Sequence, residues 1–346
     1  MIITRESLLR IARDTVKART QGDFSKHYIL SIFLTGSLLT DDPLMGNSTD
    51  IDLVFIHSMP PGIRREIVPL SPDIHLDIKH NQRDEYEPAR DLRVNPWLGP
   101  EIYNAVQLYD PDHFFDFTQA AVRDKYDDPV NVHARANLNA EHARGIWSDL
   151  VSDPKAKTSK QPKLLLRYLK SVSHAANVLP AMKSPILGER RFLIEFSPIA
   201  NAFNLPELGG ELYSLLGAGQ LQVDNLDETL NAWEQDFLEA GKYPEAEARL
   251  NPNRLAYYRR GFESVIDDGI PGAILWPLLI TWSLAASLLP QEKQTAWANT
   301  CTSLGLINEG MEANLERLDS FLDTLEGMLE QWKVQNGISE IYREEI

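Results

Sequence analysis

The 346-residue chain has 43% apolar and 24% charged residues, ordinary values for a globular protein that exclude a disordered or fibrous one. A single cysteine, Cys301, excludes an internal disulfide and indicates a reducing compartment, the cytoplasm. The first residues, MIITRESLLRIARD, carry charges and contain no unbroken apolar run, so a signal peptide is not expected.

The net charge of −16 is concentrated in the C-terminal part of the chain. From Asp224 to Ile346 there are 9 Lys+Arg and 22 Asp+Glu, a balance of −13, which leaves −3 for residues 1–223. Such an acidic region repels a phosphate backbone, so a nucleic-acid partner is not expected. A cationic small molecule or a protein partner remains compatible, although solvated acidic helix faces would give the same count.

Residues 1–112 predict a small domain with a mixed sheet. Residues 5–20 place their apolar side chains on one side of a helix, and Thr4 precedes them as an N-cap. Four runs predict strands because they are rich in β-branched and aromatic residues or alternate in polarity: residues 28–34, 50–57, 73–80 and 105–110. Residues 82–104 are polar and contain three prolines, so a short helix and loops are expected there.

Residues 113–346 predict an all-helical domain, which makes the whole chain α+β. The clearest helical patterns cover residues 132–150, 163–179 and 308–333. In the last of these, apolar residues recur at spacings of four and three from Met311 to Trp332, a heptad pattern. The pattern indicates packing within a helical bundle, with the seam of a homodimer as the alternative.

Residues 270–290 carry no charge and are long enough to span a membrane. They also contain three prolines and three hydroxyl side chains, and their flanks show no charge asymmetry. These features favour a helix buried in the core, and no membrane association is expected.

Three aspartates on two predicted strands indicate an acidic cluster. Residues two apart in a strand face the same side, so Asp50 and Asp52 share a face, and a neighbouring strand would bring Asp77 beside them. Three carboxylates in one patch repel one another unless a divalent cation lies among them. Oxygen ligands favour Mg²⁺, with Mn²⁺ as the alternative. Incidental surface carboxylates are the other explanation, above all for Asp77, because Asp73 lies four residues away and the register could slip.

Gly36 and Ser37 follow a predicted strand and precede a short predicted helix. Glycine lets the backbone approach a ligand closely, and a serine hydroxyl with free amide groups can bind phosphate oxygens. Beside metal-bridged carboxylates, such a turn completes the parts of a phosphoryl-transfer site.

This combination resembles the signature of the DNA-polymerase-β-like nucleotidyltransferase superfamily. It consists of Gly36-Ser37, the run TDIDL at 49–53 and the run HLDI at 75–78. The helical domain is similar to that of the antibiotic- and small-substrate-modifying members, which transfer a nucleoside monophosphate from an NTP to a hydroxyl with Mg²⁺. Two features depart from the pattern: the loop LLTDDPLMG is longer and more apolar than the usual spacer, and Thr49 stands where serine is common.

The resemblance implies roles for individual residues of the predicted catalytic domain, residues 1–112. Asp50 and Asp52 would bind the metals that bridge the triphosphate of an NTP such as ATP. Asp77 would complete one metal site and act as the base, or orient the base, for the acceptor hydroxyl. Nucleotide contacts would come from Gly36, Ser37 and Thr49.

The resemblance also implies that the helical domain, residues 113–346, closes over nucleotide and acceptor. Arg167 and Lys170 would supply cations to the triphosphate, with Arg190 and Arg191 as the alternative pair. The acceptor would be a hydroxyl of a small molecule or a protein.

Two alternatives to this enzyme stay open. The first is a non-catalytic nucleotide-sensing or scaffolding module that retains the fold. The second rests on two Arg-x₆-His spacings, Arg135…His142 and Arg167…His174, which resemble those of helical RNases that accompany minimal nucleotidyltransferases. Such a spacing arises easily by chance.

Overall fold

The computed structural model describes residues 3–21, 28–154, 161–183 and 186–338. Over these residues the chain has the expected α+β fold, with one five-stranded mixed sheet and a helical remainder. The strands are β1 (Ile29–Thr35), β2 (Thr49–His57), β3 (Arg65–Pro69), β4 (Ile74–Gln82) and β5 (Val106–Tyr109). The α-helices are α1 (Arg5–Thr20), α2 (Leu98–Asn104), α3 (Phe114–Arg123), α4 (Pro129–Ser152), α5 (Pro162–Ala176), α6 (Pro180–Lys183), α7 (Phe192–Ala202), α8 (Glu207–Leu215), α9 (Leu226–Ala240), α10 (Leu255–Asp267), α11 (Leu275–Leu288), α12 (Thr295–Ser303) and α13 (Glu309–Gln335).

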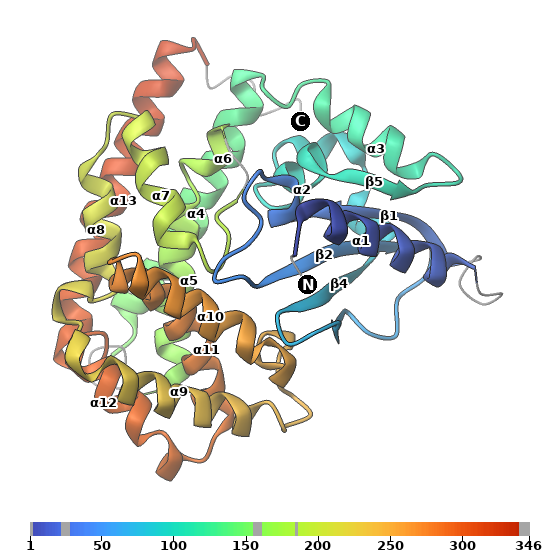
Figure 1. Cartoon of the computed structure of the whole chain (residues 1–346). Coiled ribbons are helices and arrows are strands. Elements are labelled where there is room, and N and C mark those ends of the chain that lie inside the picture. Colours follow the sequence, from blue (N-terminus) through green and yellow to red (C-terminus); the bar gives the residue numbers. More distant parts are fainter. Residues whose placement is uncertain (1–2, 22–27, 155–160, 184–185, 339–346) are drawn as a thin grey trace. The chain divides into compact units, whose positions relative to one another are not determined.

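The chain divides into two compact units, whose elements are drawn in Figure 1. The first unit combines Met1–Asp127 with Asn253–Ser264, and the second combines Asp128–Pro252 with Val265–Ile346. The boundary expected after residue 112 precedes α3, and α3 belongs to the first unit. The first unit is therefore discontinuous in sequence, because the chain returns to it with the beginning of α10.

The sheet of the first unit has the strand order β3-β4-β2-β1-β5. The pair β2 and β4 is parallel, and the other neighbouring pairs are antiparallel. All four expected strands are present, at slightly different limits. The edge strand β3 was not expected from the sequence.

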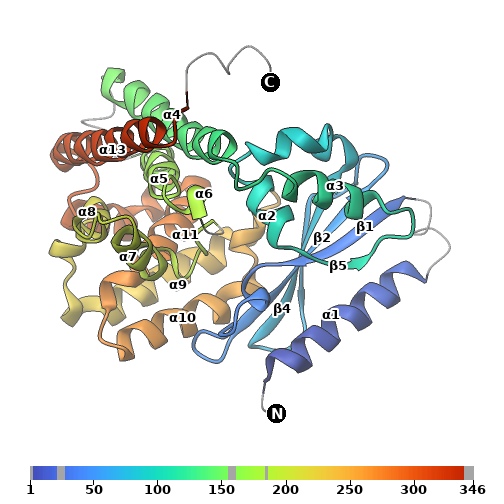
Figure 2. The same ribbon diagram turned by 90° about the horizontal axis from the view of Figure 1, so that it is seen from above.

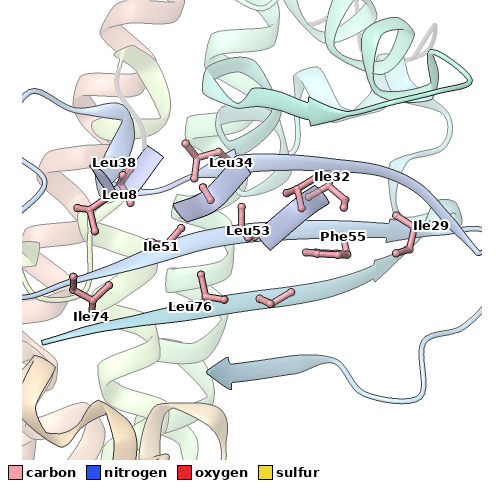
Figure 3. Packing of buried hydrophobic residues seen from close by; sticks show 13 residues of the cluster. Leu8, Ile29, Ile32, Leu34, Leu38, Ile51, Leu53, Phe55, Ile74 and Leu76 are labelled. Atoms are coloured by element: carbon pink, nitrogen blue, oxygen red, sulfur yellow. The ribbon is translucent and has the colours of Figure 1, made fainter. Parts of the chain in front are cut away.

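Helices lie on both faces of this sheet, α1 on one and α2 with α3 on the other (Figure 2). On one face α1 packs with its apolar stripe, and Thr4 caps it by accepting a hydrogen bond from the Ser7 amide, as expected. Figure 3 shows this cluster, whose labelled members are Leu8, Ile29, Ile32, Leu34, Leu38, Ile51, Leu53, Phe55, Ile74 and Leu76. On the other face, residues of α2 and α3 pack against Phe33, Val54 and Ile56.

The second unit is helical throughout its described residues, and its long helices fill its own core. Most heptad residues of α13 are buried there, which agrees with bundle packing: Met311, Leu315, Leu318, Leu322, Leu325 and Leu329. The last one, Trp332, is half-buried. Residues Pro271–Leu288 have a mean hydropathy of 1.4 and are apolar and long enough to cross a membrane, but 67% of this stretch is buried within the protein. It has the burial of a core helix.

Candidate functional site

The parallel pairing of β2 and β4 brings the predicted carboxylates together. In the register of this pair, Asp50 lies opposite His75 and Asp52 lies opposite Asp77. All four side chains therefore project from one face of the sheet, at the end where both strands begin. Ile51 and Leu53 turn to the opposite face and are fully buried. The expected acidic cluster is present, and the register does not slip toward Asp73.

The Gly36 turn lies directly against the carboxylate of Asp52. Gly36 has φ of 75° and ψ of −159°, a conformation that is open essentially to glycine alone. A Cβ atom at this position would lie 1.9 Å from Oδ2 of Asp52. The backbone of the Gly-Ser turn therefore packs directly against the side chain of Asp52, and a side chain at position 36 would block this contact.

Ser37 and Thr49 close the loop between β1 and β2. Thr49 is fully buried, and its hydroxyl donates a hydrogen bond of 2.9 Å to the carbonyl of Pro43. The hydroxyl of Ser37 lies 3.2 Å from that of Thr49. Gly36 is exposed and Ser37 is half-buried, so these two residues remain accessible to a ligand, whereas the hydroxyl of Thr49 is engaged inside the loop.

Two arginines that the sequence did not single out neutralise Asp77. Arg65 of β3 binds it in a bidentate manner, with Nε 2.6 Å from Oδ1 and Nη2 2.5 Å from Oδ2. Arg254 places Nη1 2.5 Å from Oδ2 of Asp77 and Nη2 3.5 Å from Oδ2 of Asp50. The side chains of Arg254 and Asp77 are only 2% and 1% exposed. Repulsion among three carboxylates therefore does not require a metal ion, because guanidinium groups already supply the opposite charge.

The surroundings shift the pKa values of Asp52 and Asp77, which face each other across the strand pair, in opposite directions. Burial raises the pKa of Asp52 well above its usual range, and the charges of Asp50 and Asp77 raise it further. Burial would also raise the pKa of Asp77, but the hydrogen bonds from Arg65 and the charge of Arg254 outweigh it, so this pKa lies below the usual range. A role of Asp77 as the base, or in orienting the base, stays a prediction.

A metal ion fits part of this cluster. Asp50, His75 and Asp77 offer ligand atoms that lie within 4.8 Å of one another, so this group could hold a metal ion. Asp77, however, already accepts three charge-assisted hydrogen bonds, and a metal ion there would have to displace a guanidinium group. Asp50 and Asp52 offer the oxygen donors that Mg²⁺ prefers. A metal ion held by Asp50 and Asp52, with or without Asp77, stays a prediction.

The predicted cationic residues of the helical region lie in the second unit. On α5 the guanidinium of Arg167 lies 3.4 Å from a carboxylate oxygen of Asp153, and Lys170 is exposed. Arg190 is buried. A role for any of these residues at the triphosphate stays a prediction. The RNase-like spacing brings His142 and His174 into a stack with ring centroids 5.3 Å apart, but Arg135 is fully buried and donates to the carbonyl of Ala181.

Weak signals for the two missed arginines exist in the sequence. Arg65 opens the run REIVP, a short β-branched segment between Gly62 and Pro69 that is typical of an edge strand. Arg254 precedes Tyr257 and Tyr258 at helical spacing, and its guanidinium lies 5.0 Å and 5.5 Å from their ring centroids. An arginine followed by aromatic residues at this spacing indicates a cation–π contact, although it does not name the carboxylate partner.

Comparisons with known proteins add little to this geometry. No protein-family model and no curated protein matches the chain. Among solved structures, the chain is similar to a nucleotidyltransferase-like protein from Exiguobacterium sibiricum, with 10% identity and a TM-score of 0.26 over 74% of this chain and 77% of the other. A likeness at this level carries no argument about ligand or activity.

Proposed function

We propose that the protein binds an NTP with a divalent cation at Asp50 and Asp52 and transfers a nucleoside monophosphate to a hydroxyl group. The observation that supports it best is the contact between the Gly36 turn and Asp52. Gly36, whose backbone is exposed, packs directly against the carboxylate of Asp52, and Ser37 is the next residue of the turn. A phosphate group and its cation would meet at this point.

The cation is Mg²⁺, with Mn²⁺ as the alternative, because both donors are carboxylate oxygens. When bound, it would neutralise the triphosphate and orient its reacting phosphorus. The acceptor hydroxyl gives its proton to solvent as its oxygen forms a bond to the α-phosphorus. The bond from that phosphorus to the bridging oxygen breaks, and pyrophosphate leaves with its electron pair. Arg254 and Arg65 fix Asp77, and through the strand register they fix the backbone that carries Asp52.

The test is release of pyrophosphate from labelled ATP, GTP, CTP and UTP with Mg²⁺, across a panel of hydroxyl compounds. Asp52→Asn should lower the rate by on the order of 10³-fold or more, because it removes a metal ligand that acts in the transition state. Asp41→Asn is the matched control, since Asp41 is an exposed carboxylate in the same loop. Equal nucleotide binding and equal turnover in wild type and Asp52→Asn would contradict the proposal.

A second candidate is a non-catalytic NTP-binding module. The neutralisation of Asp77 by Arg254 and Arg65 favours it, because a polymerase-like site would use that carboxylate for catalysis. Calorimetry separates the two candidates. Tight NTP binding that depends on Asp52, with no pyrophosphate from any acceptor, would support the module and contradict the enzyme.

The acceptor class follows from charge. The −13 balance from Asp224 onward favours a cationic small molecule or a protein over RNA. A filter-binding assay at low salt tests the nucleic-acid part of this proposal. Sub-micromolar tRNA binding that weakens steeply with added salt would contradict it.

A further inference from the structure

The position between Asp50 and Asp77, where a metal ion could lie, is filled by a side chain of the protein itself. We propose that the guanidinium of Arg254 is a built-in cation that replaces a metal ion at Asp50 and Asp77. Asp77 is then an anchor for arginine and not a metal ligand, and the acidic cluster takes one divalent ion, at Asp50 and Asp52, instead of two. The proposal holds whether or not nucleotidyl transfer is found.

Arg254 is enclosed by aromatic rings on the side away from the carboxylates. Its guanidinium lies over Tyr257 and Tyr258, and Tyr257 in turn meets His75 edge-on, with ring centroids 5.1 Å apart. His75 is the third member of the group that could hold a metal. The guanidinium of Arg254 is therefore packed by residues that also surround the possible metal position at Asp50 and Asp77. Such packing is typical of a buried, ordered arginine and not of a mobile surface side chain.

The helix that follows Arg254 is fastened to the same unit by independent contacts. Arg260 of α10 lies 2.7 Å from a carboxylate oxygen of Asp73, at the start of β4. Gly46, in the loop before β2, approaches the backbone of α10 so closely that a Cβ atom would lie 2.1 Å from the carbonyl oxygen of Arg260. These contacts hold the backbone that carries Arg254 against the loop and β4.

Charge leaves no place for a second cation beside Arg254. Asp50 and Asp77 face two guanidinium groups, those of Arg65 and Arg254, so the negative charge of this pair is already balanced. A divalent ion at Asp50 and Asp77 would lie within a few ångströms of a buried guanidinium and be repelled by it. A single ion at Asp50 and Asp52 would have as a ligand Asp52, the carboxylate that neither Arg65 nor Arg254 contacts.

The deciding experiment measures Mn²⁺ binding by nucleotide-free protein. Arg254→Met removes the cation and keeps the length of the side chain, and Arg260→Met removes a neighbouring arginine of α10 as the matched control. With 1 mM MnCl₂, the melting temperature of Arg254→Met should rise by about 5 °C or more beyond the rise in wild type. The double variant Arg254→Met/Asp77→Asn should not show this extra rise. The control Arg260→Met should show the same rise as wild type. An equal rise in Arg254→Met and Arg260→Met would overturn the proposal.

Crystals of the wild-type protein soaked in MnCl₂ give a second, independent answer that does not depend on the folding of any variant. An anomalous peak between Asp50 and Asp77, with Arg254 displaced, would overturn the proposal. Arg254 in place, with no peak at that position, would support it. Neither measurement contains a nucleotide, so failure of the proposed transfer reaction would leave both results interpretable.

Discussion

Arg254 in the first unit and Arg144 in the second each bind several carboxylates, but in opposite surroundings. Arg254 is 2% exposed, and its partners Asp77 and Asp50 are 1% and 9% exposed. Arg144 is 26% exposed and contacts Asp319, Asp323 and Glu326 of α13, which are 41%, 70% and 38% exposed. The ions are chemically the same in both clusters. The two clusters differ in their exposure to water. Water screens the ion pairs of Arg144, whereas the buried charges around Arg254 are stabilised mainly by one another.

The largest expected effect comes from removing one carboxylate from each cluster. Asp77→Ala leaves Arg254 and Arg65 without their shared acceptor and should lower the free energy of unfolding by about 3–5 kcal/mol. Asp323→Ala should change it by less than about 0.5 kcal/mol. Hydrogen exchange followed by mass spectrometry reads β4 and α13 separately, so each unit reports its own change. Similar effects in both variants would show that burial does not distinguish the clusters.

Two glycine-to-alanine substitutions, one in each unit, compare how strongly the backbone conformation requires glycine. Gly36→Ala forces a side chain into a glycine-only conformation and against Asp52, so it should destabilise the first unit by about 1–3 kcal/mol. It should also reduce metal binding at Asp52. Gly327 lies in α13 with open space around its Cα, so Gly327→Ala should stabilise the second unit by about 0.5–1 kcal/mol. Thermal unfolding with and without Mn²⁺ measures both; a Gly36→Ala variant with wild-type metal binding would contradict the first expectation.

His57 and His80 of the first unit form a partly buried pair, and its dependence on pH tests how partial burial affects stability. His57 Nε2 lies 2.9 Å from His80 Nδ1, and His80 Nε2 lies 2.8 Å from Glu66, which also binds Arg19. Burial and the charge of His80 lower the pKa of His57 to about 4. The unfolded chain, with an ordinary pKa near 6.5, takes up this proton first as pH falls. Stability is therefore complete above about pH 6.5 and is lost progressively toward pH 4.

After allowance for its partial exposure, His57 should account for about 2 kcal/mol of this loss. Urea unfolding at pH 7.5, 6 and 4.5 measures it. In His57→Gln the dependence on pH should flatten over this range, and an unchanged slope would assign the loss to other groups.

The smallest expected effect is the response to salt. At 1 M salt the screening length is about 3 Å, so the half-exposed contacts of Arg144 are screened and those of Arg254 are not. Arg144→Met should cost about 1 kcal/mol at low salt and about half of that at 1 M NaCl. Some loss persists because Arg144 also packs 4.9 Å from the ring of Trp147. The cost of Arg254→Met should not change with salt.

Local patterns predicted much of the fold. Alternation in TDIDL and HLDI gave the correct faces of β2 and β4, and the register then followed from the need to bury Ile51 and Leu53. The cap at Thr4 and the buried seam of α13 were likewise visible in spacing alone. Strand β3 was missed because two arginines precede its apolar residues and a proline ends it, so it resembles a loop.

The cations of the acidic cluster could not be predicted from the same patterns. Asp77 and Arg254 are 177 residues apart in sequence, and no periodicity connects them. Repulsion among carboxylates correctly indicated that positive charge must lie nearby, but it does not distinguish a metal ion from a guanidinium group. The choice between them depends on tertiary packing, here on the return of the chain to the first unit at Asn253.

The return of the chain to the first unit at Asn253 affects the order in which this unit can fold during synthesis. At about 5–20 residues per second, the ribosome needs about 10–35 s to make the 177 residues between Asp77 and Arg254. During this interval the nascent sheet has Arg65 but lacks its second arginine. The acidic end of the sheet is therefore the last part of the first unit to mature, although its strands are among the first to be made.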